Sequence, residues 1–366
     1  MDGVSCAPRA AWLTVFVIAV LTSTASAQQP GCTDDGCSDV GKWLTTPSEG
    51  KILQTTPDAS PAPSPLAQAP IDAQPLMQPQ PDSFFDGSGP GGELADLSTI
   101  PGYIESALPR NMFRLRYDGM FENSFPDRAE FVYGQIAGGI GNQSVDLHDL
   151  RGYLELGDNE TFSVFVDVPV RWVDADVALG GLAGNPSGLG DIQAGLKYAL
   201  AQSDSTILTF LLQGYFPTGD AAEGLGTDHY SVETGLLFQH AFDSRTNVFG
   251  EFRVWNPVDG TNFAGDIFRY GLGHSHTIMD TGCYSVTAVS ELVGWTVMNG
   301  LQTGRVTQRP ESAEATIINA KLGVRINWAD QNGGRDTRSL YVGYGRVLTN
   351  DAWYEDIVRV DYSIFF

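Results

Sequence analysis

The pattern of apolar and polar positions changes character near residue 111. From there to the end of the chain, short segments alternate apolar and polar side chains and are separated by turn residues. Such alternation is typical of β-strands, because successive side chains leave a strand on opposite faces. In the clearest segment, IINAKLGVRINW, every second residue from Ile318 to Trp328 is apolar.

About twelve strands are predicted in this way. Their ranges are 112–118, 150–156, 164–172, 191–200, 206–216, 230–240, 247–255, 266–274, 285–297, 317–328, 338–347 and 356–366. Two all-β architectures fit them. A soluble sandwich or barrel buries the apolar face, whereas a membrane barrel turns the apolar face to lipid and the polar face to a lumen.

Three features favour the membrane barrel. Many of the segments are long enough for a tilted crossing of a bilayer. The connectors alternate in length: 158–161, 201–205 and 242–246 are short, whereas 119–146, 217–229 and most of the others are long. This is the usual asymmetry of periplasmic turns and external loops. Aromatic residues that lie near strand ends form a candidate interfacial girdle: Trp172, Phe216, Trp255, Tyr270, Trp328, Tyr344 and Tyr362.

The last segment, DIVRVDYSIFF, alternates as far as the final residue of the chain. Val358, Val360, Tyr362, Ile364 and Phe366 are apolar, and Arg359 and Asp361 lie between them. A closed barrel leaves no unpaired edge, so we expect this strand to pair with the first one, near Phe113 to Tyr117. A terminal strand ending on an aromatic residue resembles the signal that the barrel-assembly machinery reads, so Tyr362, Ile364 and Phe366 are the candidate assembly signal.

The N-terminal part predicts export. An apolar run from Ala11 to Thr22, too short to span a bilayer as a helix, precedes the small residues Ala25, Ser26 and Ala27. We therefore predict a cleaved signal peptide over 1–27. Residues 28–110 are rich in Pro, Ala and Gln and predict a disordered periplasmic tether, in which 100–108 has the pattern of a short helical turn.

The remaining composition limits the partners. A net charge of −23 excludes the clustered cations that a nucleic-acid site needs. In an oxidising compartment Cys32 and Cys37 are close enough in sequence to form a loop disulfide, and Cys283 has no assigned role. Neither a metal nor a cofactor site is predicted.

The predicted inward face is ionic and nearly balanced. The candidate lumen residues are Arg114, Arg116, Asp118, Arg151, Glu155, Asp167, Arg171, Asp191, Lys197, Glu233, Glu251, Arg253, Arg269, Glu291, Lys321, Arg325, Arg359 and Asp361. Such a lumen is either a wet pore whose charges filter solutes or a cross-linked interior that stabilises the barrel. Loops or the tether would be able to plug it.

Two motifs carry a resemblance to a known family. GLGDIQAGLKYAL (188–200), followed by FPTGD (216–220), resembles the outer-membrane barrels associated with the meta pathway of phenol degradation. FPDRAEFVYGQ (125–135) and FSVFVDVPVRW (162–172) resemble related barrels, especially from planctomycete-type bacteria. The resemblance covers about 111–366. It implies an antiparallel outer-membrane barrel that passes small solutes, including hydrophobic or aromatic compounds.

Two functions other than transport fit parts of the sequence. A structural barrel that anchors the envelope through its tether fits the Pro-rich segment equally well. A hydrolase would need a nucleophile beside a base such as His229, which has Asp228 next to it, and no nucleophile motif accompanies them. His274 and His276 share a strand face but lack a third ligand. The sequence therefore predicts a channel or transporter and no enzyme.

Overall fold

The structure is a computed structural model that describes seven segments of the chain. These are residues 100–123, 145–175, 185–258, 265–300, 316–329, 336–350 and 352–366. The predicted signal peptide, Cys32, Cys37 and most of the predicted tether lie outside the described residues. No helix in the described part is long and apolar enough to cross a membrane.

Twelve long antiparallel strands make up the described part of the chain. They are β1 (Met112–Asn123), β2 (Val145–Gly157), β3 (Phe162–Ala175), β5 (Ile192–Gln202), β6 (Thr206–Phe216), β7 (Ser231–Ala241), β8 (Thr246–Pro257), β9 (Ile267–Asp280), β10 (Tyr284–Val297), β11 (Thr316–Ala329), β12 (Asp336–Val347) and β13 (Asp356–Phe365). The short β4 (Ser187–Leu189) and β5 both pair with β3, β4 at residues 170–172 and β5 at residues 162–167. Together they form one strand of the barrel wall that is interrupted at Gly190 and Asp191. A single 3₁₀ turn, η3 (Ala221–Glu223), lies between β6 and β7.

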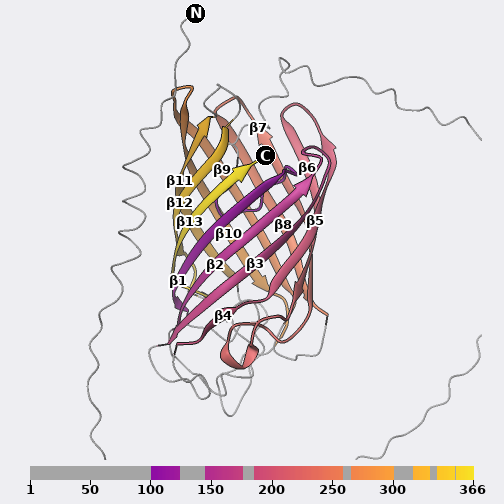
Figure 1. Ribbon diagram of the computed structural model, residues 1–366, viewed down its shortest axis with the longest axis vertical. Coiled ribbons are helices and arrows are strands. Elements are labelled where there is room, and N and C mark those ends of the chain that lie inside the picture. Colours follow the sequence, from indigo (N-terminus) through magenta and orange to yellow (C-terminus); the bar gives the residue numbers. More distant parts are fainter. Residues whose placement is uncertain are drawn as a thin grey trace, which may run out of the picture. The chain divides into compact units, whose positions relative to one another are not determined.

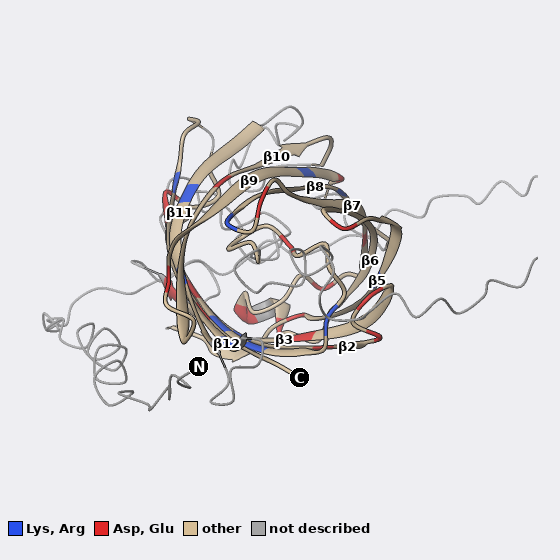
Figure 2. Ribbon diagram, turned by 90° about the horizontal axis from the view of Figure 1, so that it is seen from above, with Lys and Arg blue, Asp and Glu red and all other residues tan. Residues whose placement is uncertain are grey.

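The strands close into a barrel (Figures 1 and 2). Each long strand pairs with the next along the chain, and β1 pairs with β13 from Met112↔Phe365 to Phe121↔Asp356. Every strand therefore has a partner on both sides, and no edge is left with unpaired backbone groups. The predicted number of strands and the predicted pairing of the first strand with the last are both confirmed.

The two faces of the wall are inverted relative to a soluble protein. Apolar side chains such as Leu115 and Leu322 point outward and are 43% and 63% exposed, whereas Lys197 and Arg325 inside are 0% and 1% exposed. An outward apolar surface of this extent is stable only against lipid. The predicted transmembrane barrel is therefore confirmed.

Short turns and long connections lie at opposite ends of the barrel. The strand ends joined by the short connections 158–161, 203–205, 242–245, 281–283 and 330–335 lie at the end at which β1 begins and β13 ends, here called the short-turn end. The strand ends joined by the connections 124–144, 176–186, 217–230, 258–266, 298–315 and 348–355 lie at the other end, the long-loop end. This is the predicted asymmetry, and the periplasmic position of the short-turn end stays a prediction.

Aspartates shape two of the short turns. The Asp158 carboxylate accepts the amides of Glu160, Thr161 and Phe162 at 2.7–2.9 Å, which closes the turn between β2 and β3. The Asp243 carboxylate accepts the amides of Arg245 and Thr246, and these hydrogen bonds hold the pKa of Asp243 below its ordinary value. Cys283, which had no predicted role, lies in the turn between β9 and β10 and is disulfide-bonded.

Residues 100–110 differ from their prediction. They were predicted to belong to the disordered tether and to contain a helical turn, but the segment is ordered, bent and not helical. Nearly all its residues are buried; Ile104 and Ala107, for example, are 4% and 2% exposed. Figure 2 looks along the barrel and shows chain inside the ring of strands. We call residues 100–110 the plug segment, because its contacts place it in the lumen.

Candidate functional site in the lumen

The middle of the plug segment is held by a single carboxylate. Glu291, which points inward from β10, accepts hydrogen bonds from the amides of Gly102, Tyr103 and Ile104 at 3.0, 2.8 and 3.1 Å. These three backbone donors have no strand partner inside the lumen. A charged acceptor therefore replaces water for all three at once.

Guanidinium groups from three further strands bind the carbonyls of the same stretch. Arg325, Arg359 and Arg269 donate to the oxygens of Pro101, Gly102 and Tyr103 at 2.7, 3.0 and 3.2 Å. The Tyr103 ring lies between two cations, with Lys321 Nζ 4.0 Å and the Arg359 guanidinium carbon 4.2 Å from its centroid. The segment is thus bound through its backbone and one aromatic ring.

The rest of the plug segment contacts the wall nearer the short-turn end. The Glu105 carboxylate lies 2.9 Å from Lys197 Nζ and 3.7 Å from Arg114, and the Glu105 amide donates to Glu251. Thr209 donates to the carbonyl of Ala107, and the Arg110 amide donates to Glu155 at 3.1 Å. Contacts from β1, β2, β5, β6 and β8 therefore hold this part of the segment.

All the predicted lumen residues lie on the inward face, but they divide into two groups. Eleven of the eighteen line a cavity beside the plug segment: Arg114, Arg116, Asp118, Arg151, Asp167, Arg171, Asp191, Arg253, Arg269, Lys321 and Arg359. Seven do not line it: Glu155, Lys197, Glu233, Glu251, Glu291, Arg325 and Asp361. Five of these seven contact the plug segment directly. Much of the predicted ionic lumen therefore binds the protein's own chain.

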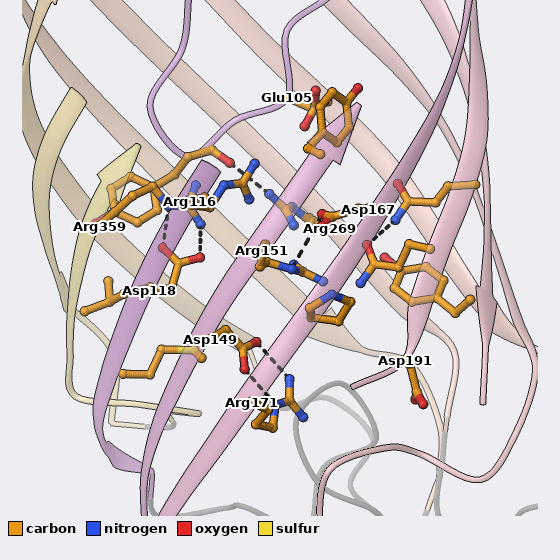
Figure 3. A pocket seen from close by; sticks show the side chains of 18 of the residues that line it. Glu105, Arg116, Asp118, Asp149, Arg151, Asp167, Arg171, Asp191, Arg269 and Arg359 are labelled. Atoms are coloured by element: carbon orange, nitrogen blue, oxygen red, sulfur yellow. Dashed lines mark hydrogen bonds and ion pairs between the residues drawn. The ribbon is translucent and has the colours of Figure 1, made fainter. Parts of the chain in front are cut away.

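The cavity has a volume of about 140 Å³, which is room for several water molecules. Two bidentate ion pairs stand on its wall (Figure 3): Asp118 with Arg359 at 2.6 and 2.8 Å, and Asp149 with Arg171 at 2.8 and 3.0 Å. Asp149 was not among the predicted residues. It shares the inward face of β2 with Arg151, so its position in the alternation was sufficient to find it.

Toward the long-loop end the inward face becomes apolar, which the sequence analysis missed. Ile357, Met120, Leu147 and Val173 are consecutive partners across β13, β1, β2 and β3, and all four are buried. We call the apolar belt the set of these residues together with the buried inward residues Trp255, Ile267, Trp295, Val297 and Ile317. Each member lies an even number of residues from a charged lumen residue on the same strand. This spacing places it on the inward face and could have identified the belt from the sequence.

One aromatic prediction is wrong. Trp255 was placed in the outer girdle, but it is 5% exposed and faces the cavity beside Tyr215, with ring centroids 5.8 Å apart. By contrast, Trp172, Phe216, Tyr344 and Tyr362 are exposed on the outward face. The difference arises because every second residue of β8 points inward, and Trp255 continues the inward series of Glu251 and Arg253.

The two motifs that carried the family resemblance meet in space. Asp191, at the break between β4 and β5, accepts the Gly219 amide at 3.0 Å and both the amide and the hydroxyl of Thr227 at 2.8 and 2.7 Å. Thr218 donates to the carbonyl of Gly190. A Cβ at Gly226 would lie 2.5 Å from the Asp191 carboxylate, so only glycine fits there. These contacts fold loop 217–230 inward, where Leu225 joins the apolar belt.

Replacing Asp191 by Ala is expected to release loop 217–230. The change leaves the amides of Gly219 and Thr227 without their acceptor, a loss of about 1–3 kcal/mol for buried donors. Hydrogen exchange measured by mass spectrometry should show faster exchange in this loop, while the strand amides stay protected. Glu223→Ala removes an exposed carboxylate from the same loop and is the matched control. Equal exchange in the two variants would contradict this role of Asp191.

The candidate histidines do not line the lumen cavity. His229 Nδ1 lies 2.7 Å from the carbonyl of Thr227, to which it donates, and does not pair with Asp228. His274 and His276 stack at 6.4 Å and point outward from β9, away from the lumen. Among the described residues, no group of three or more His, Cys, Asp or Glu side chains is arranged to hold a metal.

Several solved structures are similar to this chain. An outer membrane channel from Pseudomonas putida F1 is 15% identical, with a TM-score of 0.49, and the match covers 73% of this chain and 99% of that one. The NanC porin is 9% identical with a TM-score of 0.42, covering 69% and 100%. A Pseudomonas aeruginosa FadL homologue is 10% identical with a TM-score of 0.36, covering 70% and 90%.

No curated protein matches this chain. Residues 141–292 match the family model described as "Putative MetA-pathway of phenol degradation". The matched stretch contains both motifs that meet at Asp191, and it runs from the end of the first long connection into β10. It confirms the resemblance predicted from the sequence: over residues 141–292, this barrel is similar to the members of that family.

Proposed function

We propose that this protein is an outer-membrane channel for small solutes, and that the plug segment sets how far its lumen is open. The observation that carries the proposal is the cavity of about 140 Å³ between the plug segment and the wall. Charged groups line it, whereas a barrel that is only a scaffold is expected to fill its interior. Hydrogen bonds, ion pairs and ring contacts hold the described plug segment, and all of these are reversible.

The solutes we propose are small and partly apolar. The apolar belt supports this, because a solute that enters from the long-loop end meets Met120, Trp255 and Trp295 before it meets the charged wall. Hydrophobic or aromatic compounds, which the family description suggests, fit such a path. A solute without apolar surface would gain nothing from the belt.

Purified barrel in a planar lipid bilayer is expected to show discrete conductance steps of low amplitude, because the plug segment leaves only a narrow path. The measurement is single-channel current over a broad voltage range, on protein whose folding is verified by heat-modifiable gel migration. A folded barrel that stays silent, both intact and with residues 100–110 deleted, would contradict the channel. Such silence would favour the second candidate, an anchoring barrel, which the bound plug segment also fits.

We also propose that the end of β13 carries the signal for the barrel-assembly machinery. Tyr362, Ile364 and Phe366 point outward and are 36%, 36% and 64% exposed, and the Phe366 amide bonds to the Asn111 carbonyl at 3.2 Å. Deleting Phe366 is expected to lower the amount of folded barrel in outer membranes severalfold, as quantified by heat-modifiable migration. Phe162→Ala, which truncates an equally outward aromatic residue near the same end, is the control. Normal assembly without Phe366 would sink the proposal.

A further inference from the structure

The arginines on the cavity wall fall into two classes. Arg171 and Arg359 each donate two hydrogen bonds to one carboxylate, and Arg253 and Arg269 lie within 2.7 Å of theirs. Arg114, Arg116 and Arg151 differ. Their nearest carboxylate oxygens lie 3.7, 4.0 and 3.5 Å away, and none of the three side chains makes a hydrogen bond within the described part of the chain. Arg114 lies near two carboxylates, Glu105 and Asp361, whereas Arg116 and Arg151 each lie near one.

These two arginines lie directly opposite each other. Arg116 on β1 and Arg151 on β2 are Cα partners in the strand register, and both line the cavity. Figure 3 shows their side chains as neighbours above the Asp149–Arg171 pair. Like charges directly opposite on adjacent strands destabilise a sheet. An anion beside the two guanidinium groups would offset their mutual repulsion.

The neighbouring acids compensate this pair only in part. Asp167 lies 3.5 Å from Arg151 Nε without a hydrogen bond to it, and Asp361 lies 4.0 Å from Arg116 Nε. Asp118 and Asp149 flank the pair along β1 and β2 but are already bound bidentately by Arg359 and Arg171. Asp361, the cross-strand partner of Arg116 on β13, accepts the Ser363 hydroxyl and also lies near Arg114. The Nε atoms of Arg116 and Arg151 are themselves buried without a partner. Buried donors of this kind are rare unless a ligand or water completes them.

We propose that Arg116 and Arg151 form a carboxylate-binding subsite in the lumen, and that its ligand is a small organic monocarboxylate with an apolar body. Two guanidinium forks facing one cavity match the geometry of a carboxylate. The inward face of β1 continues from Arg116 past Asp118 to Met120 of the apolar belt, a distance of about 13 Å along the strand. The cavity is lined by both the charged pair and members of that belt, which accommodates an apolar body beside the bound carboxylate.

This inference rests on the proposed channel function, and equilibrium binding tests it separately. Isothermal titration of benzoate into the purified, folded barrel should show saturable binding, with at least tenfold weaker binding of neutral benzamide. Acetate, which has the carboxylate but almost no apolar body, should also bind more weakly. Benzamide binding as tightly as benzoate would overturn the carboxylate site. Acetate binding as tightly as benzoate would contradict the proposal that the ligand has an apolar body that contributes to binding.

Variants locate the site. The double variant Arg116→Gln/Arg151→Gln should lose benzoate binding by at least tenfold, and Arg116→Lys/Arg151→Lys, which keeps the charge but not the fork, should also bind more weakly. Arg346→Gln/Asp356→Asn removes an ion pair that lies outside the cavity, and this variant should bind as the unmodified protein does. Unchanged binding in the Gln double variant would overturn the proposal. If the unmodified barrel binds benzoate but never conducts, the channel fails while the subsite stands.

Discussion

Deleting residues 100–110 is expected to raise the single-channel conductance of the barrel severalfold. The segment occupies the lumen, and its described interactions with the wall are noncovalent. Its removal leaves a charged channel through a twelve-stranded barrel, which is wider than the eight-stranded barrels whose interiors side chains can fill. Planar-bilayer recordings of the intact and the deleted protein measure the difference directly.

A deletion of equal length separates the plug segment from the chain that precedes it. Removing residues 61–71 of the Pro-rich stretch should leave conductance unchanged. A single substitution provides a second route, because a Cβ at Gly102 would lie 2.3 Å from the Tyr341 ring. Gly102→Val is therefore expected to displace the segment and to increase conductance in the same direction. Equal conductance in the intact protein and the 100–110 deletion would show that the segment does not obstruct the path.

Replacing Arg359 by Met is expected to lower the free energy of unfolding of the barrel by about 3–5 kcal/mol. Arg359 on β13 and Asp118 on β1 form a bidentate pair across the strands that close the barrel, with side chains 9% and 7% exposed. Without Arg359, the Asp118 carboxylate stays in the lumen wall without its main cation. The Gly102 carbonyl also loses a donor. Urea unfolding followed by heat-modifiable migration gives the change.

Two further variants test the cause. Asp118→Leu/Arg359→Met removes both charges together and should recover much of the lost stability, because no uncompensated charge remains. Arg346→Met breaks an exposed pair between β12 and β13, Arg346 with Asp356 at 3.9 Å, and should cost less than about 1 kcal/mol. A double variant no more stable than Arg359→Met would point to lost packing of the arginine and not to the ion pair.

The segments that could be predicted were those whose signal is local. Strands such as Ile318 to Trp328 show their two faces in a few residues, since alternation depends only on strand geometry. The seam between β1 and β13 followed from the requirement that no edge stays unpaired in a membrane. Loop asymmetry came from counting residues between strands. Each of these inferences needs only neighbouring positions in the chain.

The lumen was only partly predictable. The alternation assigned Arg116, Arg151 and Glu291 to the inward face but could not show what each one contacts. Glu291 binds amides 187–189 residues away, and Arg359 binds a carbonyl 257 residues away. The apolar belt and Asp149 share the parity of the predicted lumen residues, so alternation alone places them inside. Trp255 has the parity of Arg253, and this parity outweighs its position near a strand end.

The sequence by itself determined a lipid-facing barrel closed by its own last strand, because a period of two and the absence of free edges leave little choice. Only the tertiary structure decided what fills it. The sequence of the plug segment looks like part of a linker. Its order comes from carboxylates and guanidinium groups that strands distant in the sequence place around it. The strand register decided the rest. It placed Arg116 opposite Arg151, with the nearest carboxylates 4.0 and 3.5 Å away, and no local sequence pattern encodes this pairing.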